Sequence, residues 1–117
     1  MTRRPDGALE HDVMAALWGA DGPLAPNEVR ERLPFELAYT TVATVLGRLH
    51  AKGLVERTDG GRAYRYVASV DEAQLAARRM GDVLSGASDR AAVLAGFVGS
   101  LSKRDASAVR ALLERTR

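Results

Sequence analysis

The feature that most constrains this sequence is a helix-length apolar stripe followed directly by two short strand-like runs. The stripe recurs every three or four residues, as the buried face of a helix does, and consists of Val42, Val45, Leu46 and Leu49. Gly53 follows it as a suitable helix C-terminal cap residue. The runs Leu54–Arg57 and Arg62–Val67 flank Asp59-Gly60-Gly61, which is a strong hairpin turn signal. The sequence therefore predicts a helix, beginning within residues 38–40 and ending near Lys52, joined to a β-hairpin.

Two further amphipathic segments precede this helix. The first has helical spacing and ends at the breaker cluster of residues 19–23; its apolar residues are Leu9, Val13, Met14, Ala16, Leu17 and Trp18. The second is short, with Pro26 in its first turn, Val29 and Leu33 facing inward, and Pro34 at its end. A helix, a short helix, a longer helix and a hairpin follow one another in the order of a winged helix-turn-helix domain.

The pattern is purely helical from residue 69 onward. Ser69 and Glu72 have the spacing of a capping box, and Gly86 ends the stripe that follows them, which is formed by Ala73, Ala76, Ala77, Met80, Val83 and Leu84. Ser88 or Asp89 can cap a second helix, whose stripe is Leu94, Phe97, Val98 and Leu101. Ser102 and Asp105 repeat the capping spacing before a third stripe of Val109, Leu112 and Leu113.

The fold class predicted is mainly α with a small β-wing, in two domains. Residues 1–68 form the winged-helix domain and residues 69–117 form a three-helix module. Because so short a module rarely buries enough apolar area by itself, its stripes need a partner surface. We expect a second copy to supply it, through Met80, Leu84, Leu94, Phe97, Val98, Leu101, Val109, Leu112 and Leu113. A monomeric helical core, folded back on the first domain, is the alternative.

The helix at residues 38–52 carries a small, hydroxylated and basic face opposite its apolar stripe. Gly47 and Ala51 are small, as a helix near the floor of the major groove requires, and the other residues of this face are Thr40, Thr41, Thr44, Arg48 and Lys52. An ordinary solvated face would carry more Glu and Lys, and three Thr in five positions are poor helix formers. This face therefore favours recognition of double-stranded DNA over an inert surface.

The hairpin adds three arginines: Arg57, Arg62 and Arg65. Cationic side chains near a hairpin tip can reach phosphates or the minor groove, although charge also protects edge strands. Residues 38–68 hold five basic side chains against two acidic ones, whereas the whole chain has a net charge of +2. Tyr64 and Tyr66 alternate toward one side of the strand, and we expect both rings to lie in the core.

Several functional classes find no support in the sequence. The chain has no cysteine, which excludes disulfides and thiolate metal sites. His11 and His50 have no metal-ligand spacing to acidic residues, and no phosphate loop, nucleophile elbow or carboxylate pair is present. We therefore expect no enzyme activity, no metal and no cofactor. The chain also has no secretory signal and no apolar run long enough to span a membrane, which predicts a cytoplasmic protein without membrane contact.

Taken together, these motifs resemble the BlaI/MecI-type penicillinase repressor family over essentially the whole chain. Leu9–Trp18 is similar to the first helix of that family, and Glu28-Val29 matches its second. Ala38–Leu49 with Lys52–Val55 looks like its recognition helix and first wing strand, and Gly61–Tyr66 looks like its second wing strand.

The resemblance implies a homodimer that represses transcription from a palindromic operator with TACA/TGTA-like half-sites. Thr41, Thr44 and Arg48 match the positions from which the family reads bases, and Thr40 and Lys52 match phosphate contacts. In the best-known members, a sensor protease triggers cleavage before a Phe; the matching bond here is Gly96–Phe97, with Gly where those members have Asn. A winged-helix protein–protein adaptor and a ligand-gated regulator are the alternative functions.

Overall fold

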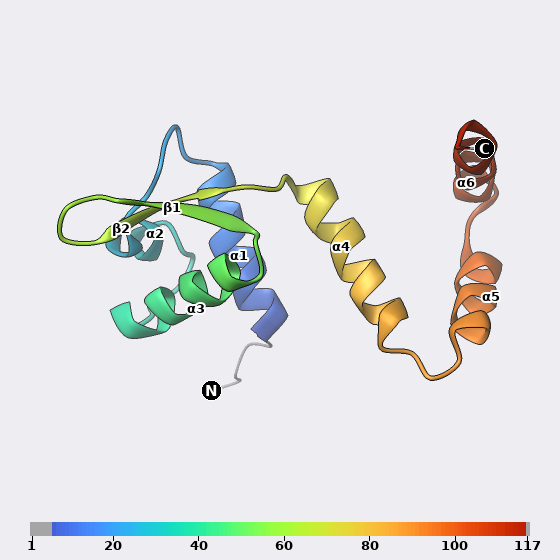
Figure 1. Cartoon of the computed structure of the whole chain (residues 1–117), viewed down its shortest axis with the longest axis horizontal. Helices are drawn as coiled ribbons and strands as arrows, with labels where there is room; N and C mark the ends of the chain where they lie inside the picture. Colours follow the sequence, from blue (N-terminus) through green and yellow to red (C-terminus); the bar gives the residue numbers. More distant parts are fainter. Residues whose placement is uncertain (1–5, 117) are drawn as a thin grey trace. The chain divides into compact units, whose positions relative to one another are not determined.

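The computed structural model describes residues 6–116 and divides into two compact units, the first running to Leu75 and the second beginning at Ala76. Helices and strands follow in the order α1 (Asp6–Trp18), α2 (Pro26–Glu31), α3 (Tyr39–Ala51), β1 (Val55–Asp59), β2 (Tyr64–Ala68), α4 (Glu72–Ser85), α5 (Arg90–Ser100) and α6 (Lys103–Arg115). This mainly helical fold with a two-stranded wing confirms the fold class expected from the sequence (Figure 1).

The first unit is built around one apolar core. Every element of the unit contributes to it, and its buried members are Val13, Met14, Leu17, Leu24, Val29, Leu33, Val42, Val45, Leu46, Leu49, Leu54, Val55, Tyr66 and Leu75. The whole predicted stripe of α3 belongs to this set, with exposed fractions of 4% or less. Burial of each such side chain stabilises the fold by about 1.5–3 kcal/mol, so the stripe fixes the rotation of α3 about its axis.

Helix α2 starts at a capping box in which the N-cap residue has no side chain that can accept a hydrogen bond. Ala25 occupies the N-cap position, and its backbone N–H donates to Glu28 Oε1 at 2.9 Å. Pro26 occupies the first turn, as expected. The helix ends at Glu31, earlier than the Pro34 stop predicted, yet Leu33 still reaches the core from the turn that follows.

The hairpin pairs β1 with β2 antiparallel, with Arg57 opposite Tyr66 and Asp59 opposite Tyr64. Its strands begin and end one or two residues later than the runs expected from the sequence. Gly61 takes φ +93° in the loop, a conformation that glycine adopts without strain, and its N–H donates to Asp59 Oδ1 at 3.0 Å. In Figure 1 the hairpin extends beyond the helices of the first unit and forms the wing.

The start of α4 differs from the sequence expectation. Ser69 and Glu72 do not form a capping box; Asp71 and Gln74 do, through Gln74 N–H to Asp71 Oδ1 at 2.7 Å and Asp71 N–H to Gln74 Oε1 at 2.8 Å. Ser69 is instead held by the segment that joins α3 to β1, because its N–H donates to the Leu54 carbonyl at 2.9 Å. The first turn of α4 thus begins two residues later than predicted.

The first turn of α4 is also part of the first unit. Leu75 is 3% exposed and lies in the core. Just before the helix, the Trp18 indole Nε1–H donates to the Val70 carbonyl at 2.8 Å, across 52 positions of sequence. Hydrogen bonding and burial therefore attach the segment around residues 70–75 to α1.

In the second unit, α5 and α6 bury none of their described side chains. Asp89 is the N-cap of α5 and accepts from Ala92 N–H, and Ser102 is the N-cap of α6 and accepts from Asp105 N–H, each at 3.0 Å. Both caps were among those expected. The apolar stripes therefore form on helices as predicted, but most of their side chains remain exposed within residues 76–116.

The capping arrangement of α4 makes a direct prediction. Replacing Asp71 with Ala removes the acceptor for Gln74 N–H, which we expect to lower the free energy of unfolding by about 0.5–2 kcal/mol. Ser69→Ala is the matched control, because its hydroxyl makes only a 3.4 Å contact to the Gly53 carbonyl. Urea unfolding of both variants measures the difference, and an equal loss in the two would contradict the assignment of Asp71 as the cap.

Candidate nucleic-acid interface

Helix α3 presents a continuous exposed face opposite its buried stripe. Thr40, Thr41, Thr44, Arg48 and Ala51 are all exposed, and Gly47 is half-buried among them. The face follows directly from the sequence, because four buried positions at helical spacing leave the remaining positions to solvent. Gly53, with φ +77°, then turns the chain out of the helix and into the hairpin. No acidic residue occurs in the thirteen residues of α3.

Arg48 is the free cation of this face. Among the residues that the structure describes, 6–116, no carboxylate pairs with its guanidinium. It lies in the last turn of α3, where the helix dipole favours positive charge. A guanidinium without an internal partner, on an exposed helix face, can donate to an acceptor supplied from outside.

Lys52, by contrast, is already paired. Its Nζ lies 2.9 and 2.8 Å from the two carboxylate oxygens of Glu10, which joins the end of α3 to α1. The lysine side chain is 54% exposed and the glutamate side chain 13% exposed. A phosphate approaching Lys52 would share this ammonium with Glu10.

Arg65 is engaged in the same way at the wing. Its guanidinium Nη1 donates to Glu28 Oε1 at 2.8 Å, and the same oxygen accepts the Ala25 N–H at 2.9 Å. Glu28 thereby links the start of α2 to strand β2. The hydrogen bond from the Ala25 backbone, together with the charges of Arg65 and Arg32, holds the pKa of Glu28 below its ordinary value of 4.5, against a partial opposing effect of desolvation.

The two tyrosines of β2 have different environments, which corrects the expectation that both lie in the core. Tyr66 is 5% exposed, but Tyr64 is 47% exposed. Both lie on one face of the strand, with ring centroids 6.5 Å apart, but only Tyr66 belongs to the apolar core. The guanidinium carbon of Arg57 lies 4.1 Å from the centre of the Tyr64 ring, which is a cation–π contact.

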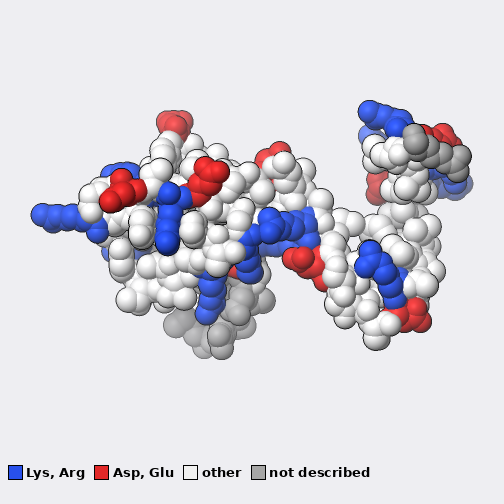
Figure 2. Space-filling model, viewed as in Figure 1, with Lys and Arg blue, Asp and Glu red and all other residues white. Residues whose placement is uncertain are grey.

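Arg62 lies in the exposed loop between the strands, and no carboxylate within residues 6–116 pairs with it. Figure 2 shows a basic side chain extending past the end of the hairpin. The structure therefore places α3 and the wing side by side in one unit, and Arg48 on α3 and Arg62 in the wing loop both lack a carboxylate partner within residues 6–116.

The sequence did not single out Glu28 or Glu10 as partners of these cations. Glu28 had a detectable signal, because it lies three residues after Ala25, which is the capping-box spacing, but Ala at the N-cap concealed the motif. Glu10 and Lys52 are 42 positions apart, and no local pattern relates them.

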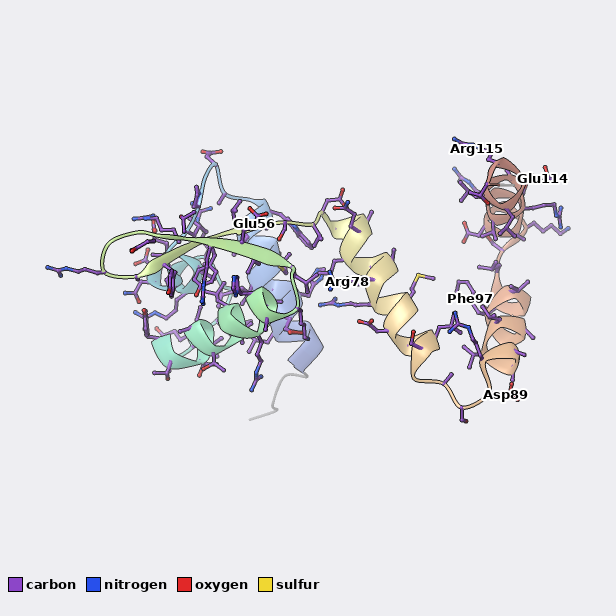
Figure 3. The ribbon with its side chains drawn as sticks, viewed as in Figure 1. Glu56, Arg78, Asp89, Phe97, Glu114 and Arg115 are labelled. Atoms are coloured by element: carbon purple, nitrogen blue, oxygen red, sulfur yellow. The ribbon has the colours of Figure 1, made fainter. Side chains whose placement is uncertain are left out.

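The residues expected to form a dimer interface lie in the second unit, where most are exposed. Met80, Leu94, Phe97, Val98, Leu112 and Leu113 have exposed fractions between 44% and 65%, Val109 is 36% exposed, and Leu84 and Leu101 are half-buried. Helices α4 and α5 form an open groove of about 430 Å³, whose lining includes Met80, Leu84, Leu94 and Phe97. The others lie outside that groove. Figure 3 shows Phe97 on α5, and Gly96 precedes it in the same helix.

Residues 6–116 contain neither a metal-ligand cluster nor a membrane-spanning helix. No cluster of three His, Asp or Glu suited to a metal ion occurs in residues 6–116. His11 packs edge-on against Trp18, with ring centroids 5.8 Å apart, and His50 is half-buried in α3. None of the helices described is long and apolar enough to cross a bilayer.

The helix order and the two-stranded wing define a winged helix-turn-helix fold. The family described as penicillinase repressor matches residues 7–115, and the chain belongs to that family. It is therefore a DNA-binding transcriptional repressor and not an enzyme.

Relatives agree with this assignment. A transcriptional regulator BlaI from Mycobacterium tuberculosis strain CDC 1551 / Oshkosh is 40% identical over 112 residues, covering 92% of this chain and 81% of the relative, and the protein from strain H37Rv gives the same values. Among solved structures, BpsR of Bordetella bronchiseptica has a TM-score of 0.50 and 19% identity, covering 93% of this chain and 73% of that one. The last comparison supports the fold alone.

The Glu28 contacts predict a pH-dependent contribution to stability. Because the folded-state pKa is lowered, ionised Glu28 stabilises the fold above about pH 4.5, and this contribution is lost as the pH falls through the lower folded value. We expect Glu28→Gln to be less stable than the parent at pH 7, with a difference that shrinks by pH 3. Urea unfolding at both pH values measures this, and Glu36→Gln, in an exposed loop, corrects for net charge. An equal difference at both pH values would contradict the prediction.

Proposed function

We propose that this repressor binds a palindromic operator as a homodimer, with α3 of each copy in the major groove. The observation that carries the proposal is the exposed face of α3, which combines three threonines with the unpaired guanidinium of Arg48. The major groove of DNA admits a helix if the side chains that contact the base edges are short. An adaptor that no longer bound DNA would have no need for this face, and acidic residues that would repel phosphates do not occur on it.

In this arrangement Thr41, Thr44 and Arg48 read bases, and Thr40 and Lys52 contact phosphates. Arg48 can donate two hydrogen bonds to guanine O6 and N7, and threonine methyl groups can contact the methyl of thymine. Lys52 lies at the C-terminal end of the helix, where its ammonium is shared with Glu10. Contacts to phosphates position the helix and contacts to base edges give it sequence preference.

The wing contributes a second contact to the same duplex through Arg57, Arg62 and Arg65. Arg62 is exposed in the loop between the strands, and Arg57 is held over the exposed ring of Tyr64 at 4.1 Å. Arg65 holds the wing to α2 through Glu28, so that a phosphate would compete with a carboxylate for it. We therefore assign Arg62 the main electrostatic contact and Arg65 a mainly positioning role.

A second copy covers the apolar surface of residues 76–116. Helices α5 and α6 bury nothing within one chain, and their exposed Val, Leu and Phe side chains would otherwise lie in water. Residues 91–100 of α5 carry no charge. A two-fold dimer presents two copies of α3, and its symmetry is that of a palindromic operator.

A sensor protease is the proposed source of induction, with the Gly96–Phe97 bond as its target. This bond lies inside α5, whereas proteolysis favours exposed, locally open chain. Cleavage therefore requires α5 to unwind first. Pairing of two copies would protect the bond, and release of the pair would expose it.

Arg48→Ala tests the role of α3. We expect affinity for a duplex selected by the parent protein from a random pool to fall by about 1–3 kcal/mol, because a base contact is lost, while affinity for random-sequence DNA changes much less. A mobility-shift titration at several salt concentrations measures both. Arg104→Ala removes the same charge from an exposed position of α6 and serves as control. Equal weakening on both DNAs would assign Arg48 to phosphate contact, and unchanged binding would place recognition elsewhere.

Leu94→Asp and Phe97→Asp test the dimer. An unpaired carboxylate in a packed apolar interface is costly, so we expect both variants to sediment as monomers where the parent sediments as a dimer. Neither side chain is buried within one chain, so the first unit should keep its unfolding transition. Ser107→Asp is the control, because its position is on the side of α6 away from Val109, Leu112 and Leu113. Variants that remain dimeric would overturn this interface.

A further inference from the structure

Gly47 is a glycine that the fold does not require. It lies in the interior of α3, where glycine destabilises a helix by about 0.5–1 kcal/mol relative to alanine. Gly53 and Gly61 have positive φ and need the freedom of glycine, but Gly47 does not. A Cβ built on Gly47 meets no atom within 4 Å outside the local helix backbone and adjacent residues. Nothing within residues 6–116 therefore accounts for the missing side chain.

Gly47 lies on the face of α3 assigned to DNA. Thr44 is one turn before it, Ala51 one turn after it, and Arg48 is its neighbour in sequence; these three are exposed. Along this line the side chains shorten toward Gly47, where the helix has no side chain at all. The flanking threonine and arginine carry the hydrogen-bonding groups.

We propose that Gly47 is a specificity-determining residue, at which the backbone of α3 approaches a base-pair edge too closely for a side chain. The proposal rests on the placement of α3 in the major groove. Hydrogen bonds from Thr44 and Arg48 to bases hold only within a narrow range, with donor–acceptor distances of about 2.7–3.2 Å. A methyl group between the helix and the bases would move the helix outward, and both contacts would lengthen together.

The substitution Gly47→Ala separates stability from DNA binding, because the two should change in opposite directions. We expect the unfolding midpoint to rise by roughly 2–6 °C, since alanine favours the helix. We expect affinity for the duplex selected by the parent from a random pool to fall by about tenfold or more. Affinity for random-sequence DNA, which depends on phosphates, should change much less, so that the ratio between the two affinities falls.

Ala15→Gly is the matched control. Ala15 is exposed in the interior of α1, and the exchange there should lower the unfolding midpoint and leave DNA affinity unchanged. Gly47→Ser extends the series, since a larger side chain should weaken selective binding at least as much as the methyl group does. The control shows that a change in helix stability alone does not alter affinity.

The outcomes separate this inference from the function on which it rests. Selection that enriches no sequence with the parent protein would overturn both. Selective binding by the parent together with binding by Gly47→Ala within about twofold of it would overturn only the inference. A lower unfolding midpoint for Gly47→Ala would also overturn it, because the glycine would then serve the fold.

Discussion

Burial of the apolar stripe of α3 is the interaction on which the remainder of the first unit depends. Val42, Val45, Leu46 and Leu49 are between 0% and 4% exposed, and together they fix how the helix is rotated. With that rotation set, Thr40, Thr44 and Arg48 have no alternative but to face solvent. The proposed recognition face and the buried stripe are therefore opposite sides of α3, and a residue on the exposed side can change without cost to the core.

The wing depends on two contacts near the start of α2. Leu24 pairs with Tyr66 through two backbone hydrogen bonds of 2.9 and 2.8 Å, which adds a bridge to the edge of β2. Glu28 then joins Arg65 to the start of the helix. A two-stranded hairpin alone is marginally stable in water, so these attachments to a rigid helix are what give the wing a defined position. The proposed phosphate contacts need this defined position, because each arginine of the wing must lie within hydrogen-bonding distance of a phosphate.

Local patterns in the sequence predicted the helices and the hairpin, because helical and strand periodicities are properties of neighbouring residues. The errors occur where distant residues compete. Ser69 fits a capping box by spacing, but the Leu54 carbonyl holds its backbone, and Asp71 caps instead. Tyr64 shares a face with Tyr66, but the core ends before it. Leu75 lies outside the stripe predicted for α4, yet it is the residue of that helix that enters the first core. The pairing of Glu10 with Lys52 has no signal in the sequence. For the site, the sequence indicated the face of α3; the ion pairs that occupy Lys52 and Arg65 needed the structure.

The two units differ in where their stability comes from, and this difference has consequences for regulation. The first unit encloses its own core, whereas α5 and α6 bury none of their described side chains in a single chain. If a second copy covers them, the order of the second unit depends on protein concentration while that of the first does not. In the proposed dimer, joining two first units raises the effective concentration of the second unit at its half-site. Loss of pairing would therefore weaken operator binding far more than loss of one contact would. In the proposed dimer, an event that opens α5 would end repression while leaving the first unit folded.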